Sequence, residues 1–214
     1  MKPLYEKYRP QSFEDVVGQD KAIARIRQIA SRGVGGRAFW ISGKSGTGKT
    51  TLAWIIARQV AGEGAIRELD AGDCTPAKIR EIESDMRFIS MFEPGGHAFI
   101  VNEAHGLRKD AIRQFLVLLE RLPGHTCIIF TTTFEGEDRL FEDDIDSSPL
   151  MSRCIRVPLT SQGLAKVFAA KAKQIAQAEG LDGKSLSDYE KLVYKHKCNL
   201  RAVLQEIDAG VMME

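Results

Sequence analysis

The sequence lacks a long hydrophobic run and an excess of charge of one sign. It contains no stretch of about 18 consecutive apolar residues, so it predicts no transmembrane helix, and its first residues lack the apolar core of a secretion signal. The 30 basic and 29 acidic residues give a net charge of +1, which excludes a general attraction to nucleic acid or anionic membranes. Any contact with DNA therefore needs a local patch.

Cysteine is also scarce. The four cysteines stand singly, with no CxxC pair and no histidine at metal-ligand spacing, and they are Cys74, Cys127, Cys154 and Cys198. They predict reduced, mostly buried thiols in a soluble, cytoplasmic protein with no membrane partner. A chain of 214 residues can bury roughly 70% of its unfolded surface, so we expect a real hydrophobic core.

What the chain does contain is a phosphate-binding loop. Residues 43–50 match GxxxxGK[ST] at every fixed position, between a strand-like and a helix-like apolar run. The glycines let backbone N–H groups curl around phosphate oxygens, and the next helix presents the positive end of its dipole. Lys49 would bridge the β- and γ-phosphates of ATP, and the Thr50 hydroxyl would bind Mg²⁺. The loop residues expected to bind nucleotide are Ser45, Gly46, Thr47, Gly48, Lys49, Thr50 and Thr51.

Short apolar runs alternate with helical periodicity in the first three quarters of the chain. Strands are expected at 38–41, 66–70, 97–101, 127–130 and 154–157, and helices at 20–31, from 76 to about 90, and around 112–119. Thr75 is expected to cap the helix that starts at Pro76. Five strands alternating with helices predict an α/β fold with a five-stranded parallel sheet covered on both faces.

The strand signals stop at Pro158. The remainder predicts three helices at 161–179, 187–195 and 199–209. We therefore predict a phosphate-loop core over residues 1–157 and a small helical lid domain over residues 158–214. The acidic stretch 135–144 is interpreted as a solvated loop.

Asn102 and Glu103 follow an expected strand at the place where a phosphate-loop ATPase needs acidic groups. The usual pair is Asp-Glu, in which Asp holds the Mg²⁺ shell and Glu polarises the attacking water. Glu103 keeps the second role, whereas Asn102 offers only a neutral carbonyl oxygen to the metal. We expect nucleotide binding with weaker Mg²⁺ dependence and slower hydrolysis. The alternative is a polar strand end without a catalytic role.

Two later segments have both a functional and a structural interpretation. A hydroxyl of Thr131–Thr133 would reach the γ-phosphate or the attacking water, although threonines are also good strand formers. Arg153 either pairs with a surface carboxylate or acts as a finger on a neighbouring subunit's nucleotide, an effect of about 10³–10⁵ in rate.

Seven motifs, in this order and approximate spacing, resemble AAA+ clamp-loader ATPases. They are Tyr8-Arg9-Pro10, Val17-Gly18-Gln19, the phosphate loop, Asn102-Glu103-Ala104-His105, Thr131–Thr133, Ser152-Arg153-Cys154 and Asn199-Leu200-Arg201. The chain is similar to the bacterial gamma/tau subunit and to the small subunits of replication factor C over nearly all 214 residues. The resemblance implies an AAA+ fold, ATP and Mg²⁺ as cofactors, and a cytoplasmic, nucleoid-associated role in DNA replication.

The resemblance also assigns roles to single residues. The adenine pocket would be lined by Tyr8, Arg9, Pro10 and Val17. Thr132 would be the first nucleotide sensor, with Thr131 or Thr133 in its place if the register differs by one. Arg153 would be the finger that acts in trans, and Arg201 the second sensor on the lid.

A DNA-facing surface is implied as well. Helix N-termini and four cations would contact backbone phosphates without reading bases, and these cations are Lys78, Arg80 and Arg87 on one helix and Lys109 at the start of another. A solvated helix surface is the alternative interpretation.

Three features depart from the family pattern. Asn102 replaces the usual Asp, Cys74 stands alone where gamma/tau has clustered zinc cysteines, and the helical collar that follows the lid in relatives is missing from these residues. The favoured hypothesis is an ATP-driven motor in a ring of AAA+ subunits that handles a sliding clamp and primed DNA. The alternative is a structural subunit that holds ATP, hydrolyses little and lends Arg153 to a neighbour. A small-molecule kinase fits the loop but explains neither Arg153 nor Arg201.

Overall fold

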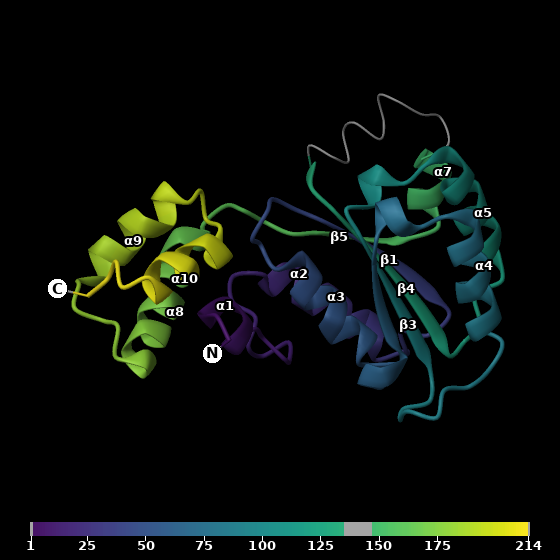
Figure 1. Cartoon of the computed structure of the whole chain (residues 1–214), viewed down its shortest axis with the longest axis horizontal. Coiled ribbons are helices and arrows are strands. Elements are labelled where there is room, and N and C mark those ends of the chain that lie inside the picture. Colours follow the sequence, from purple (N-terminus) through teal and green to yellow (C-terminus); the bar gives the residue numbers. More distant parts are fainter. Residues whose placement is uncertain (1, 135–146, 214) are drawn as a thin grey trace.

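The structure, a computed structural model, describes residues 2–134 and 147–213. The predicted acidic loop at 135–144 thus lies outside the described residues. Figure 1 shows an α/β body and a smaller helical body, with the amino-terminal segment between them. Within the described ranges, no helix combines the length and apolarity needed to cross a bilayer.

A five-stranded sheet forms the centre of the larger body. The strands are β1 (Arg37–Ser42), β2 (Ile66–Asp70), β3 (His97–Asn102), β4 (Thr126–Thr132) and β5 (Ile155–Pro158), in the order β2-β3-β4-β1-β5. Every neighbouring pair is parallel. The predicted five-stranded parallel sheet is confirmed, and its inner strands are apolar because both faces are covered.

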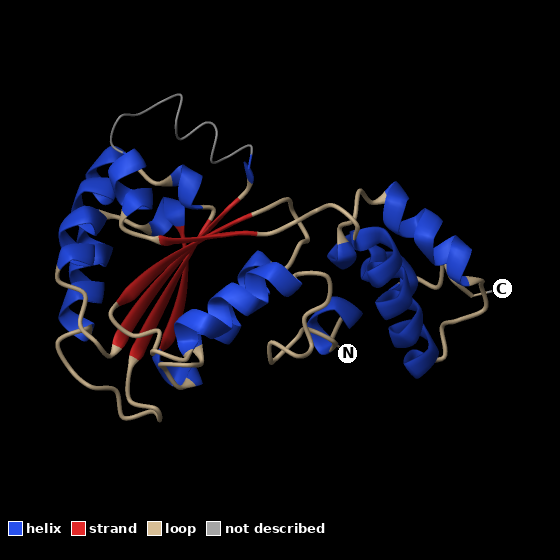
Figure 2. Ribbon diagram, turned by 180° about the vertical axis from the view of Figure 1, so that it is seen from behind, coloured by secondary structure: helices blue, strands red, loops and turns tan. Residues whose placement is uncertain are grey.

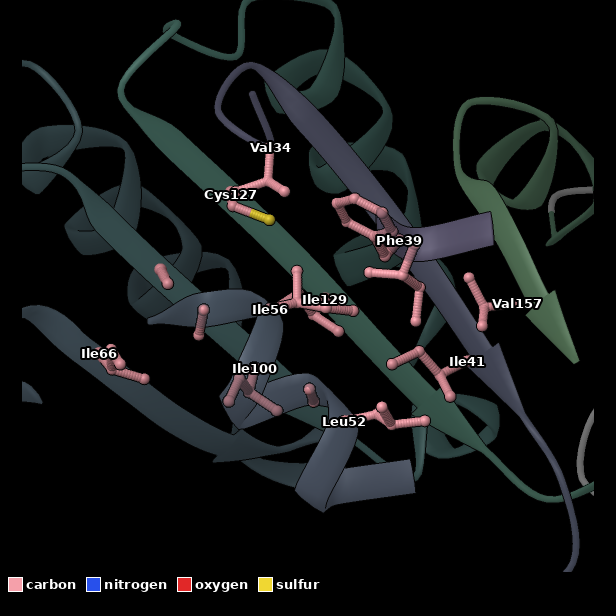
Figure 3. Packing of buried hydrophobic residues seen from close by; sticks show 14 of the residues in the cluster. Val34, Phe39, Ile41, Leu52, Ile56, Ile66, Ile100, Cys127, Ile129 and Val157 are labelled. Carbon is pink, nitrogen blue, oxygen red and sulfur yellow. The ribbon is translucent and has the colours of Figure 1, made fainter. Parts of the chain in front are cut away.

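Helices cover both faces of this sheet. On one face lie α2 (Asp20–Ala30) and α3 (Lys49–Ala57), and on the other lie α4 (Pro76–Asp85), α5 (Lys109–Glu120) and α7 (Ser147–Ser152), as Figures 1 and 2 show. Leu52 and Ile56 of α3 pack against Ile100 and Ile129 of the sheet (Figure 3). This packing fixes the start of α3, and with it the phosphate loop, at the carboxyl edge of the strands.

The smaller body consists of α8 (Leu164–Glu179), α9 (Leu186–Lys195) and α10 (Leu200–Asp208). These helices share a hydrophobic cluster of their own, and Leu4 of the short helix α1 (Leu4–Lys7) belongs to it. Tyr5, Tyr8 and Val17 pack against the same cluster. The division at residue 157 stays a prediction, and the amino-terminal segment packs on the lid cluster although its sequence precedes the sheet.

Several element boundaries differ from those predicted. Helix α4 begins at Pro76 with the Thr75 hydroxyl accepting from the Lys78 N–H, as predicted, but ends at Asp85 and not near residue 90. The predicted end was wrong because the apolar residues beyond it, Phe88 and Ile89, are exposed and provide no helical core face. Arg87 consequently lies after the helix that was expected to carry it. The sequence prediction also missed α1, α7 and the 3₁₀ turns Glu63–Ala65, Ala71–Asp73 and Ala104–Gly106.

Candidate nucleotide-binding site

The phosphate loop connects β1 to α3. Its backbone turns at Gly46 and Gly48, whose φ angles of +76° and +97° favour glycine. Lys49 begins α3 and is 8% exposed. Its Nζ donates to the carbonyl oxygens of Gly43 at 3.0 Å and Lys44 at 3.1 Å. The ammonium group is thus held inside the loop, where phosphate oxygens would replace these neutral acceptors.

Oxygen atoms from three elements meet beside the first turn of α3. The Asn102 Oδ1 atom, at the end of β3, accepts from the Thr131 hydroxyl of β4 at 2.9 Å and from the Thr50 hydroxyl of α3 at 3.4 Å. A hydroxyl beside a side-chain carbonyl is a hard-oxygen donor set, which suits Mg²⁺. Thr50 and Asn102 therefore fit the predicted metal-binding role, in which nucleotide phosphates would supply further oxygens.

The three threonines at the end of β4 do not face the same way. Successive side chains of a strand alternate between its faces, so Thr131 lies on the α3 face and Thr132 on the opposite face. The Thr132 Oγ1 atom bonds His105 Nδ1 at 3.1 Å and donates to the Thr133 carbonyl at 3.2 Å. Of the hydroxyls considered for the first sensor, the structure brings Thr131, and not Thr132, next to Thr50 and Asn102.

Glu103 directly follows Asn102 and has a left-handed backbone, with φ 50° and ψ 46°. A non-glycine residue in this region costs about 1–3 kcal/mol, and such strain clusters at functional sites. The Glu103 side chain is exposed, and its Oε2 lies 3.4 Å from His105 Nδ1. The carboxylate is therefore accessible at the carboxyl edge of the sheet, as a group that orients water requires.

An open pocket lies between the phosphate loop and the lid. The pocket brings together all four residues predicted for the adenine, Tyr8, Arg9, Pro10 and Val17, with the loop residues Gly46–Gly48 and Thr51 and with Arg201 of α10. Three predicted loop residues, Ser45, Lys49 and Thr50, do not line it.

Hydrogen bonds connect the pocket lining near Tyr8 to the end of α8. Glu179 accepts from the Tyr8 hydroxyl and from Lys7 Nζ, the latter at 2.7 Å. These hydrogen bonds, from Lys7 first and then from Tyr8, hold the pKa of Glu179 below its usual value. On the other side, the Arg201 guanidinium lies 5.7 Å from the centre of the Tyr5 ring. Arg201 thus reaches the pocket from the lid.

The lid touches the phosphate loop directly at Asn199. Its Oδ1 caps α10 by accepting from the Ala202 N–H at 3.2 Å, and a Cβ placed on Gly46 would lie 2.1 Å from that same oxygen. The two residues before it, Lys197 and Cys198, have φ angles of 51° and 60°, so the chain turns sharply to bring Asn199 onto the loop.

Gln19 makes a second junction between core and lid. It is 2% exposed, and its amide donates to the Thr160 carbonyl at 3.0 Å and accepts from the Thr160 N–H at 3.0 Å. The same NH₂ group approaches the Thr47 carbonyl of the phosphate loop at 3.4 Å. The sequence reasoning missed roles for Gln19 and Asn199, although both stand in the motifs that carry the resemblance.

The remaining predicted residues lie away from the pocket. Arg153 forms an ion pair with Glu120 at 2.7 Å and donates a hydrogen bond to the Pro149 carbonyl at 3.1 Å. Within this single chain, Arg153 thus forms the surface ion pair that was one of its two interpretations. Among the DNA candidates, Lys78 pairs with Glu81 at 2.6 Å, and Arg80 and Arg87 are exposed. Lys109 is the first residue of α5.

Comparison with known families agrees with this geometry. The family "ATPase family associated with various cellular activities (AAA)" matches residues 39–158, which include the phosphate loop, Asn102 and Arg153. The chain belongs to the AAA family. This membership assigns the phosphate loop to a nucleotide-binding fold, for which a bound metal, generally Mg²⁺, is typical.

Curated relatives come from DNA replication. The chain is 25% identical to DNA polymerase III subunit gamma of Buchnera aphidicola, covering 97% of this chain and 61% of that protein. It is 30% identical to replication factor C small subunit 1 of Pyrobaculum arsenaticum, covering 83% of this chain and 53% of the relative. The chain thus spans about half to three fifths of the length of these AAA+ relatives.

Solved structures show the same fold at lower identity. The Holliday junction branch migration motor RuvB of Thermotoga maritima is 21% identical, with a TM-score of 0.68 over 94% of this chain and 64% of that one. A DNA polymerase III gamma subunit-related protein of the same organism is 14% identical, with a TM-score of 0.52 over 83% of this chain and 69% of that one. At these identities the likeness establishes the fold alone.

Proposed function

We propose that this AAA chain binds ATP and Mg²⁺ between its phosphate loop and its helical lid, as an ATPase subunit of clamp-loader type. The observation that carries the proposal is the pocket in which Tyr8, Val17, Gly46–Gly48 and Arg201 meet. One side of this pocket belongs to the core and the other to the lid, so a bound nucleotide would connect the two bodies. Nucleotide state would thereby set their relative position.

Each polar group at the edge of the sheet has a role in this proposal. Lys49 binds phosphate oxygens after leaving the loop carbonyls, while Thr50 and Asn102 hold the metal through oxygen atoms. Bound Mg²⁺ would supply positive charge to the β- and γ-phosphates. Glu103 orients the attacking water and accepts its proton. Thr131 is the best-placed sensor hydroxyl, because it already contacts Asn102.

The assembly is part of the proposal. Relatives named as gamma and replication factor C subunits support a ring of AAA+ subunits that handles a sliding clamp and primed DNA. Arg153 would leave its exposed ion pair with Glu120 and contact the nucleotide of a neighbouring subunit. DNA phosphates would be contacted by Lys78, Arg80, Arg87 and Lys109.

A second candidate function is a structural subunit that binds ATP and hydrolyses little. Asn102 favours it, because a neutral carbonyl stands where an ATPase usually places a carboxylate. Such a subunit would still support hydrolysis elsewhere by supplying Arg153 to its neighbour.

An ATPase assay with Mg²⁺, with and without primed DNA and candidate partner subunits, distinguishes the two functions. A motor turns over and responds to DNA, whereas a structural subunit binds ATP with little turnover under every condition. Asn102→Asp is the informative variant, since an increase in turnover would show that Asn102 slows ATP hydrolysis by weakening the metal site. A wild-type chain that binds no ATP would contradict both functions.

A further inference from the structure

The Asn102 amide has two chemically different ends, and only one of them suits a metal site. The carbonyl oxygen can face a cation, whereas the NH₂ group would repel it. A rotation of about 180° around the last side-chain bond exchanges the two ends. A site that relies on Asn102 therefore needs a neighbour that decides which end faces Thr50.

Glu68 is that neighbour. It lies on β2, the strand next to β3 in the sheet, and its carboxylate accepts a hydrogen bond from the Asn102 NH₂ group. An ionised carboxylate only accepts hydrogen bonds, so the group facing it must be the NH₂ group. The carbonyl oxygen is thereby turned toward Thr131 at 2.9 Å and Thr50 at 3.4 Å.

The exposed Glu68 carboxylate makes a second hydrogen bond. Its Oε2 accepts from Trp54 Nε1 of α3 at 2.6 Å, while its Oε1 accepts from Asn102. The two oxygens are thus divided between the helix that carries Thr50 and the strand that carries Asn102. Outer groups that orient a ligand in this way affect metal affinity by about 10–100-fold.

We propose that Glu68 is a positioning residue that holds the Asn102 carbonyl oxygen toward the metal side of the nucleotide site. The charge-assisted hydrogen bond from the Asn102 amide to Glu68 also polarises that amide. This inference rests on the proposed function, because it concerns the Mg²⁺–ATP site of that proposal.

The test measures binding and does not depend on turnover. For the wild type and Glu68→Gln, a fluorescent ATP analogue is titrated at increasing Mg²⁺, and the Mg²⁺ concentration for half-maximal binding is recorded. We expect this concentration to rise about 10-fold in Glu68→Gln. Asp70→Asn is the matched control, because it removes the same charge from the same strand at the register position of Asn102. It should leave the value nearly unchanged.

The Asn102→Asp background separates positioning from a general structural effect. A carboxylate has two equivalent oxygens and needs no orienting partner, so Glu68→Gln should cause no loss in that background. Trp54→Phe is a further variant that removes the donor to Oε2 and keeps an aromatic ring at this position, and it should raise the Mg²⁺ requirement less than Glu68→Gln does.

The outcomes distinguish this inference from the proposed function. Equal Mg²⁺ requirements in the wild type and Glu68→Gln would overturn the positioning role while leaving ATP binding intact. The same loss from Glu68→Gln with and without the Asn102→Asp substitution would overturn it too. A wild type that binds no Mg²⁺–ATP would overturn the proposed function and this inference together.

Discussion

The two ends of the proposed nucleotide site are built differently. At the phosphate end, Lys49, Asn102 and Thr131 stand at the ends of buried, paired strands or at the start of the helix packed on them. At the base end and on the lid, Tyr8 directly follows α1 and Arg201 belongs to α10, and both helices depend on the small lid cluster and on exposed contacts such as Lys7–Glu179. We infer that the phosphate end is preformed, whereas the geometry of the base end depends on the position of the lid relative to the core.

The largest effect should come from breaking the phosphate end. Lys49→Ala removes charge-assisted hydrogen bonds worth about 1.5–3 kcal/mol each, so ATP affinity should fall about 100-fold or more. Lys44→Ala is the control, because Lys44 is an exposed neighbour in the same loop. Calorimetric titration with ATP measures both variants, and equal affinities would contradict the assigned role of Lys49.

A smaller effect should follow from the lid residue Arg201. Arg201→Ala removes a cation that would contact the terminal phosphate from the lid, so ATP affinity should fall about 10-fold and ADP affinity much less. Lys195→Ala, which removes an exposed lid cation paired with Glu206 at 2.9 Å, is the control. Equal losses for ATP and ADP would show that Arg201 does not sense the terminal phosphate.

The junction between the two ends can be tested with two glycines. Gly46→Ala and Gly48→Ala both strain a positive-φ position, but a Cβ at Gly48 meets nothing within 4 Å, whereas one at Gly46 collides with Asn199. Gly46→Ala should therefore lower the free energy of unfolding by about 1 kcal/mol more than Gly48→Ala does. It should also increase amide hydrogen exchange in α10. Identical exchange in the two variants would mean that the lid does not rest on the loop.

The smallest expected effect is on the stability of the fold at acidic pH. The pKa of Glu179 is lowered in the folded state by its bonds from Lys7 and Tyr8, so its contribution to stability is present above the unfolded value of about 4.3 and is lost as the pH falls. Glu179→Gln should therefore make the urea midpoint of unfolding fall less steeply between about pH 5 and pH 3. The measurement compares both proteins over this range, and parallel curves would contradict the expectation.

The comparison between the two ends also explains what could be predicted from the sequence. Asn102 and Thr50 were predicted to share a metal site because Thr50 completes the phosphate-loop motif and Asn102 follows an expected strand at the place where such ATPases carry an acidic residue. The alternation that separates Thr131 from Thr132 required the exact register of β4 beside β3. The contacts of Asn199 with Gly46, Gln19 with Thr160 and Glu68 with Asn102 join segments far apart in the chain, so no local pattern predicts them.

The central claim is that one nucleotide binds between core and lid. The most direct measurement is a crystal structure of the chain with Mg²⁺ and a non-hydrolysable ATP analogue. The predicted result places the triphosphate on residues 43–50, with Lys49 moved from the Gly43 carbonyl to a phosphate oxygen and the base beside Tyr8 and Val17. An empty pocket at saturating analogue, or a nucleotide bound without contact to the phosphate loop, would contradict the account.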